Sequence, residues 1–221
     1  MLFEMYRPYA SPLLLFVPLL IVSLMLTSCS LFNPTVNPGE VIFQDDFSRE
    51  DSGWDRYSDD DYTADYVDGT YVIKVFSTNM TAWSRPHLDL ENVLIRVEGL
   101  HSAGPENNVY GVICRYIDHK NFYFFMIGSD GYAGIGQYIG GEQELLSHET
   151  LLPRDAIGSM DESNLIQAAC VDDDLTLWIN GKLVFKVTSS DLTHGDVGLL
   201  VGAYDEGDVE IQFDNFSTMM P

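Results

Sequence analysis

The chain has 221 residues, 46% of them hydrophobic and 12% aromatic, which suffices for a sizeable core in one domain. Its 34 acidic residues against 11 basic ones give a formal net charge of -23. Phosphate binding needs clustered Lys and Arg, so this charge argues against nucleic acid as a partner. The acidic excess is typical of a soluble exported surface, and a bound cation or cationic ligand is the alternative.

The N-terminal residues have the pattern of a secretion signal. Arg7 precedes an apolar run at residues 13–26, and this run is shorter than the about 20 residues that a membrane span needs. The run ends in the sequence LTSC at residues 26–29, which resembles the bacterial lipobox. An uncleaved signal anchor with an incidental cysteine is the alternative.

The lipobox resemblance implies removal of residues 1–28 and attachment of a diacylglycerol group to Cys29. Residues 29–38 contain two prolines and no periodicity, and we interpret them as a lipidated tether. The sequence therefore predicts a protein of the cell envelope, lipid-anchored to the membrane and facing outside the cytoplasm.

From residue 39 to residue 219, short strand-forming runs alternate with turns, and no convincing amphipathic helix occurs. Asp68-Gly69 and Asn180-Gly181 are strong hairpin signals. This pattern predicts an all-β domain of two antiparallel sheets packed face to face. The expected strands are residues 41–43, 71–75, 87–99, 109–117, 122–127, 132–139, 142–152, 164–171, 175–179, 183–187, 197–203 and 209–216. Trp54 follows a glycine and is expected to close one end of the core.

Residues 109–127 are the expected centre of a sheet. Two apolar runs flank the polar tetrapeptide at residues 118–121, which suits a tight turn. If Ile117 faces Phe122 across a four-residue loop, Cys114, Tyr116 and Tyr123 share one face, and Arg115 lies on the other. Both faces are largely apolar. Such a hairpin is either covered on both sides, or covered on one side and lined with aromatic residues for a ligand on the other.

The cysteines give a second prediction. Without Cys29, two cysteines remain, Cys114 and Cys170, an even pair in an oxidising compartment. We expect a disulfide between them. Two buried free thiols are the alternative, and a catalytic cysteine has no activating basic neighbours beyond Arg115.

Nine short motifs follow in an order that resembles the concanavalin A-like, laminin G-type jelly-roll domains of bacterial exported proteins. The nearest named groups are the family 16 glycoside hydrolase-like and 3-keto-disaccharide hydrolase-like domains. The resemblance implies a jelly-roll sandwich whose first and last strands pair, and it implies no particular activity. The motifs are DDF (45–47), SGW (52–54), DG-x-Y (68–71), GVICR (111–115), D-x-x-NFY-x-F (118–125), DG (130–131), NG (180–181), G-x-VGL (195–199) and FDNF (213–216).

Glycoside hydrolysis needs two carboxylates that both reach the same glycosidic bond. The spacing of the family 16 enzymes is matched here only by Glu206 and Glu210, in a segment that reads as a solvated acidic turn. We therefore expect no catalysis there.

A structural Ca²⁺ is a further possibility, because calcium takes several carboxylate oxygens and the pairing of terminal strands brings Asp45 and Asp46 near Asp214. The alternatives are residues 59–61, residues 172–174 or turn aspartates without metal.

Carbohydrate binding needs flat aromatic side chains and planar hydrogen-bonding groups. We expect the ligand-binding residues to be Arg115, Trp83, Tyr110 and Tyr123, with Tyr116, Tyr132 and Tyr138 of suitable type. An Arg115 paired with an aromatic ring or a carboxylate inside the sheet is the alternative.

The overall prediction is a membrane-anchored lipoprotein with a non-catalytic jelly-roll domain that binds carbohydrate or another extracellular ligand. Its alternatives are a glycoside or 3-keto-disaccharide hydrolase and a structural envelope protein.

Overall fold

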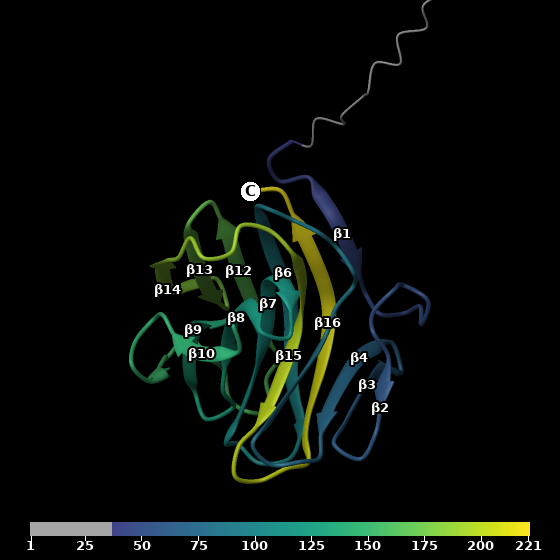
Figure 1. Ribbon diagram of the computed structural model, residues 1–221. Coiled ribbons are helices and arrows are strands. Elements are labelled where there is room, and N and C mark those ends of the chain that lie inside the picture. Colours follow the sequence, from purple (N-terminus) through teal and green to yellow (C-terminus); the bar gives the residue numbers. More distant parts are fainter. Residues whose placement is uncertain (1–36) are drawn as a thin grey trace, which may run out of the picture. The chain divides into compact units, whose positions relative to one another are not determined.

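The computed structural model describes residues 37–221, which form two antiparallel β-sheets packed face to face (Figure 1). The predicted fold class, an all-β sandwich, is confirmed. Within residues 37–221 there is no helix, and hence none long and apolar enough to cross a bilayer. The nine-stranded sheet has the order β14 (Lys182–Thr188), β13 (Asp174–Ile179), β12 (Asn164–Val171), β6 (Val93–Ala103), β16 (Val209–Met219), β4 (Thr70–Val75), β3 (Tyr62–Val67) and β2 (Tyr57–Ser58), and β1 (Val41–Asp45) also pairs with β16.

The second sheet contains the predicted central hairpin. Its order is β10 (Glu142–Leu145), β9 (Tyr132–Ile139), β8 (Asn121–Ile127), β7 (Asn108–Asp118), β15 (Asp196–Ala203) and β5 (Met80–Ser84), and β11 (Leu152–Pro153) also pairs with β9. Strand β5 lies between the expected strands at residues 71–75 and 87–99, where the sequence analysis placed no strand.

The hairpin signals act as predicted. Asn180 and Gly181 both have positive φ, 51° and 76°, and they join β13 to β14 in a two-residue turn. Asp68 and Gly69 do the same between β3 and β4. Positive φ at both central residues matches the right-handed twist of the flanking strands, which is why Asn-Gly and Asp-Gly specify such turns.

The central hairpin differs from the prediction in its register. Asp118 pairs with Asn121, so the turn has two residues rather than four, and Cys114 pairs with Tyr123. A β-bulge takes up the difference, with Arg115 in the left-handed region at φ 50°. A bulge reverses the facing of the residues that follow it. Arg115 therefore turns toward the sandwich interior and Tyr116 toward the outside, the opposite of what we expected.

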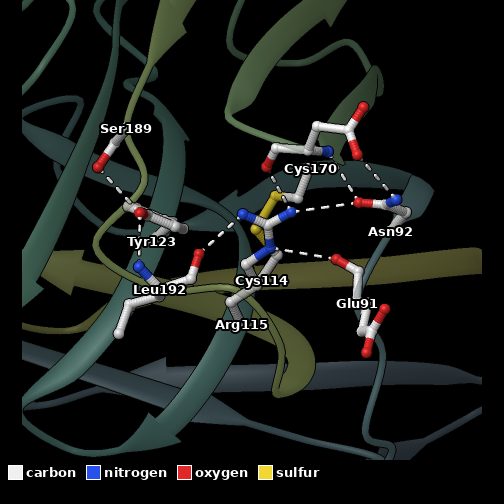
Figure 2. Close-up of a disulfide and its surroundings, with 9 residues drawn as sticks. Glu91, Asn92, Cys114, Arg115, Tyr123, Cys170, Ser189 and Leu192 are labelled. Carbon is white, nitrogen blue, oxygen red and sulfur yellow. Dashed lines mark hydrogen bonds between the residues drawn. A yellow bond between two sulfur atoms is a disulfide. The ribbon is translucent and has the colours of Figure 1, made fainter.

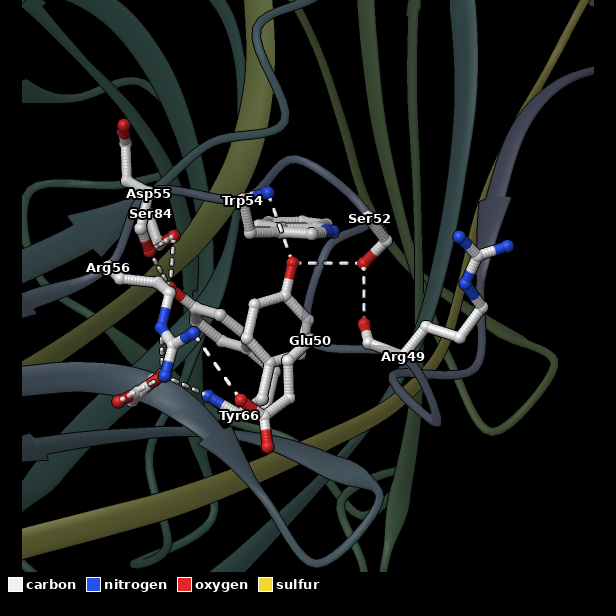
Figure 3. A network of polar contacts seen from close by, with 10 residues as sticks. Arg49, Glu50, Ser52, Trp54, Asp55, Arg56, Tyr66 and Ser84 are labelled. Carbon is white, nitrogen blue, oxygen red and sulfur yellow. Dashed lines mark hydrogen bonds and ion pairs between the residues drawn. The ribbon is translucent and has the colours of Figure 1, made fainter.

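The core lies between the sheets and is closed at one end by aromatic rings. Trp54 is buried there, as predicted, with its ring centroid 4.8 Å from that of Phe216 and 5.4 Å from those of Phe47 and Tyr71. Figure 3 shows the Tyr66 hydroxyl group next to Trp54, where it accepts a hydrogen bond from the Trp54 backbone N–H at 3.1 Å.

The two ends of the described chain meet. Strand β1 runs along the last part of β16, as the resemblance implied. The Gly39 N–H donates to the Met220 carbonyl at 2.8 Å, and the Met220 N–H donates to the Glu40 carbonyl at 2.9 Å. Figure 1 shows the C-terminus beside the start of β1.

Candidate functional site

The outward side of the seven-stranded sheet carries a second apolar cluster, separate from the core. We call its five aromatic side chains the aromatic face. They come from the adjacent strands β9, β8 and β7 and from β5, which is separated from β7 by β15. Tyr116 joins them only because of the bulge at Arg115. The residues of the aromatic face are Trp83, Tyr116, Phe122, Phe124 and Tyr138.

The rings of the aromatic face are in mutual contact. Phe122 and Tyr138, which pair across β8 and β9, are stacked with their centroids 4.8 Å apart. Trp83 and Tyr116 lie on the other side of Phe122, at 5.6 and 5.5 Å. Such distances and tilts are favourable for aromatic pairs, so the rings hold one another in place. Trp83, Tyr116 and Tyr138 are only partly buried and retain surface for a ligand.

Two glycines of β9 make room for this arrangement. A Cβ on Gly136 would lie 2.3 Å from the Phe124 ring, and a Cβ on Gly134 would lie 2.5 Å from a Leu151 methyl group. The absence of a side chain lets the Phe124 ring lie flat against the strand and lets Leu145 and Leu151 cover that edge of the sheet. A shallow hollow lies at the end of the aromatic face that Phe124 and Tyr138 form.

The hollow has a volume of about 70 Å³ and an apolar floor formed by Val109, Phe124, Met126 and Leu200. Polar groups stand at its rim. The Tyr138 hydroxyl group donates to the side-chain oxygen of exposed Gln143 at 2.8 Å, and Tyr204 is 37% exposed. The hollow is smaller than a typical small-ligand pocket, but its apolar floor and polar rim suit an apolar face with hydroxyl groups at its edge.

A charged cluster borders the aromatic face at the end of β5. The Arg85 guanidinium lies 4.3 Å above the Tyr116 ring centroid and contacts the carboxylates of Asp55 at 3.3 Å and Asp196 at 3.6 Å. His87 also contacts Asp55, at 2.8 Å. Burial raises the pKa of Asp196, although two backbone N–H groups and Arg85 oppose the shift. These contacts fix Arg85 as a planar cation at the border of the face.

Arg115 is buried and does not belong to this surface, which corrects its predicted role in ligand binding. Only 2% of the residue is exposed, and its guanidinium donates to the carbonyl groups of Leu192 and Asp172 at 2.8 Å and of Glu91 at 3.1 Å (Figure 2). A fourth hydrogen bond, at 3.3 Å, goes to the side chain of Asn92. Burial lowers the pKa of Arg115, while nearby acidic groups oppose the shift. Its role is to join three loops at one end of the sandwich.

The predicted disulfide between Cys114 and Cys170 is confirmed, and it lies beside this network (Figure 2). Both cysteines are fully buried in the core. The bridge links β7 of one sheet to β12 of the other, so it closes the sandwich across its interior.

Tyr110 and Tyr123 were also expected to bind a ligand, and both instead face the core. Tyr110 is 1% exposed and its hydroxyl group accepts a hydrogen bond from the Asn164 amide at 3.1 Å. Tyr123 is fully buried, and its hydroxyl group accepts from the Leu192 N–H at 3.0 Å. Of the four predicted ligand-binding residues, Trp83 alone lies on the outward face. The sequence argument missed Phe122, Phe124, Arg85 and Gln143.

The acidic residues proposed to hold Ca²⁺ are spread over β1, its following loop and β16. Asp45 accepts from the Phe47 N–H at 2.8 Å and from the Ser52 hydroxyl group, and Asp46 accepts from Ser48. Burial, with Glu98 and Asp46 nearby, raises the pKa of Asp214. In the described part of the chain, no three His, Cys, Asp or Glu side chains gather as a metal ion would require. Binding of a structural Ca²⁺ by Asp45, Asp46 and Asp214 stays a prediction.

The two glutamates considered for catalysis do not face each other across a groove. Glu206 is exposed in the loop between β15 and β16, and Glu210 lies in β16 on the nine-stranded sheet. Glu210 contacts the Lys74 ammonium group at 3.6 Å and accepts from the Ser102 hydroxyl group at 2.8 Å. Glu210 lies on the other sheet from the aromatic face, whereas Glu206 follows β15, two residues after Tyr204 at the rim of the hollow. The predicted signal peptide and the lipidation at Cys29 lie outside the described residues.

No protein-family model matches the chain, and no curated protein matches it by sequence. Solved structures match its fold at low identity. A galectin-like protein of unknown function from Bacillus subtilis has a TM-score of 0.60 and 8% identity, over 83% of this chain and 97% of that one. The carbohydrate-binding module CBM66 from B. subtilis has a TM-score of 0.53 and 13% identity, over 76% and 96%. An endo-β-galactosidase from Clostridium perfringens that releases GlcNAcα1-4Gal has a TM-score of 0.57 and 10% identity, over 83% and 64%. The chain therefore has the jelly-roll fold that galectin-like proteins, carbohydrate-binding modules and some glycosidases share.

Proposed function

We propose that the protein is an exported lipoprotein, anchored to the membrane through Cys29, whose jelly-roll domain binds carbohydrate on the aromatic face without catalysis. The observation that carries the proposal is the outward exposure of Trp83, Tyr116 and Tyr138 on one sheet. These three rings are partly exposed next to one another, and a contiguous apolar surface with a polar rim often marks a binding site. The fold is also one that carbohydrate-binding modules use.

Sugar rings have apolar C–H faces and polar edges, and the site offers both complements. The rings of Trp83 and Tyr116 provide flat apolar surface, and the neighbouring Arg85 guanidinium, which lies over the Tyr116 ring, places a positive charge at its border. Gln143 and the Tyr138 hydroxyl group provide a donor and acceptor pair at the rim of the hollow.

The anchor is supported by the sequence at residues 26–29 and by the disulfide. A buried bridge between Cys114 and Cys170 requires an oxidising compartment in most organisms, which fits a protein exported from the cytoplasm. One lipid chain gives only marginal membrane binding, so the two chains of a diacylglycerol group would suffice to hold the domain.

A glycan array with the full chain in detergent micelles tests the proposal. Trp83→Ala is expected to weaken binding of the captured glycan by about tenfold or more, since a central aromatic anchor contributes on the order of 2 kcal/mol. Gln143→Ala, an exposed change that leaves the rings intact, should weaken it less. Tyr57→Ala removes an exposed ring from the other sheet and should leave binding unchanged.

If no captured glycan binds more weakly to the double variant Trp83→Ala/Gln143→Ala, the location on the aromatic face is refuted. Release of shortened products from the bound glycan would instead show a hydrolase. If Cys29→Ser still places the protein in the membrane with a covalent lipid, the proposed attachment point is wrong.

A further inference from the structure

The outward side of the nine-stranded sheet carries a row of side chains that the proposed function does not use. Their positions follow from the strand pairing alone: Trp178 pairs with Gln167, Gln167 with Arg96, Arg96 with Ser217, and Ser217 with Gln44. Residues that pair directly point to the same side of a sheet. The row therefore crosses β13, β12, β6, β16 and β1, and we call it the back row.

The alternation along each strand shows that the back row faces away from the core. In β6, Ile95 and Val97 are fully buried in the core while Arg96 between them is exposed. In β12, Ile166 and Ala168 are buried on either side of Gln167. In β13, Leu177 and Ile179 flank Trp178 in the same way. Four strand spacings separate the ends of the row, about 19 Å, which is long enough for several linked sugar rings.

A hollow opens at the tryptophan end of the back row. Its volume is about 330 Å³, and Trp178, Gln167, Leu94 and Met219 line it. Leu94 and Met219 pair with each other in the neighbouring row, so they place apolar surface beside the indole. The hollow thus joins an aromatic ring, an apolar wall and a primary amide, and a concave site of this kind accepts a ring-sized ligand better than a flat bilayer does.

The polar members of the back row are available for hydrogen bonds. Among the ion pairs of residues 37–221, none uses Arg96, whereas Arg49, Arg56, Lys74, Arg85 and Lys186 each contact a carboxylate. Arg96 therefore keeps its N–H donors for a ligand, and the amides of Gln167 and Gln44 offer both donors and acceptors.

We propose that the back row is a second carbohydrate site, which binds a neutral, extended oligosaccharide with one ring stacked on Trp178 and the following rings along Gln167, Arg96, Ser217 and Gln44. The charge of the surroundings sets the ligand class. Glu98 and Asp214 pair in the next row on the same side, and the chain as a whole has a net charge of -23, so a polyanionic glycan or an anionic bilayer is repelled. The site is on the opposite sheet from the aromatic face, and it does not depend on glycan binding there.

The test uses the full chain in detergent micelles and four neutral hexasaccharides, namely cellohexaose, laminarihexaose, xylohexaose and mannohexaose, with hexagalacturonate as the charged comparison. Calorimetry measures affinity and stoichiometry. Trp178→Ala should weaken binding of at least one neutral hexasaccharide by about tenfold or more, as expected for loss of a stacked aromatic anchor. Trp178→Phe, which keeps a ring in a fold with the same packing, should retain most of the affinity. Gln167→Ala should weaken the same ligand, and Tyr57→Ala, which removes an exposed ring of the same sheet outside the back row, should leave it unchanged. Trp83→Ala is measured in parallel and reports on the aromatic face.

Several results would overturn the second site. These are the absence of binding by all four neutral hexasaccharides, unchanged binding in Trp178→Ala, and binding that Trp83→Ala abolishes and Trp178→Ala does not. The last result would leave the aromatic face as the sole site and the proposed function intact. Tighter binding of hexagalacturonate would refute the neutral class. Association of the same variants with phosphatidylglycerol vesicles is measured as well. If Trp178→Ala changes only this association and no oligosaccharide binding, the surface contacts the membrane instead.

Discussion

Loss of the disulfide between Cys114 and Cys170 should destabilise the domain mainly through the unfolded chain. The two cysteines are 56 residues apart, so the bridge closes a long loop of the denatured state. In the chain-entropy picture a loop of this length corresponds to about 4 kcal/mol at 25 °C. Domains of this size have a free energy of unfolding of about 5–15 kcal/mol, so the bridge supplies a large share of the stability.

Urea unfolding, followed by tryptophan fluorescence, measures this contribution. The oxidised protein is compared with the reduced protein and with the double variant Cys114→Ala/Cys170→Ala, in each case as a chain that begins after Cys29. The free energy of unfolding should fall by about 4 kcal/mol, and the melting temperature by roughly 8–16 °C, in both comparisons. The m-value should rise, because an unfolded chain without the bridge exposes more surface.

The reduced wild-type protein is the control for packing, since it keeps both sulfur atoms in the core. A loss of stability below about 1 kcal/mol on reduction would refute the entropic account. A much larger loss in the double variant than in the reduced protein would assign the effect to the cavity left by the sulfur atoms.

Two further predictions concern buried polar groups. Arg115→Met should cost about 3–4 kcal/mol of unfolding free energy, since four acceptors lose their donor at about 1 kcal/mol each, and urea unfolding should show only partial recovery in Arg115→Lys. A cost below about 1 kcal/mol would show that water replaces the guanidinium. Burial raises the pKa of Tyr110 from 10.0 to about 12. Its neutral form therefore stabilises the fold fully below pH 10, and this contribution is lost as the pH rises from 10 to 12. Unfolding curves of Tyr110→Phe should show a smaller alkaline loss than the wild type, and parallel losses would contradict the assignment.

The hairpins, the inward-facing side chains of some strands and the disulfide could be predicted from the sequence. Turn chemistry is local, so Asp68-Gly69 and Asn180-Gly181 specified their hairpins with no reference to the rest of the molecule. The alternation of β6 and β12 likewise predicted which side chains enter the core. The cysteine pair could be inferred from its number and compartment, because no other partner remained after Cys29.

The location of the candidate sites depended on long-range pairing. Arg115 and Tyr116 exchange faces because β7 bulges where β15 and the loop at residues 189–195 approach it, and neither contact is visible in the local pattern. A mid-strand arginine between apolar residues looks the same in sequence whether it meets a ligand or three loop carbonyls.

The sequence by itself determined that the described chain folds as two stacked antiparallel sheets, since residue alternation and turn type are read within a few positions. The tertiary structure decided which aromatic side chains remain outside. Trp83, Tyr116 and Tyr138 lie on one face of strands β5, β7 and β9 only because these strands are brought into one sheet, and Trp178 and Gln167 line up with Arg96 through a pairing between residues about 70 positions apart. Register across a sheet is fixed by the packing of the whole core, and a shift by one residue would turn each of these side chains to the other face.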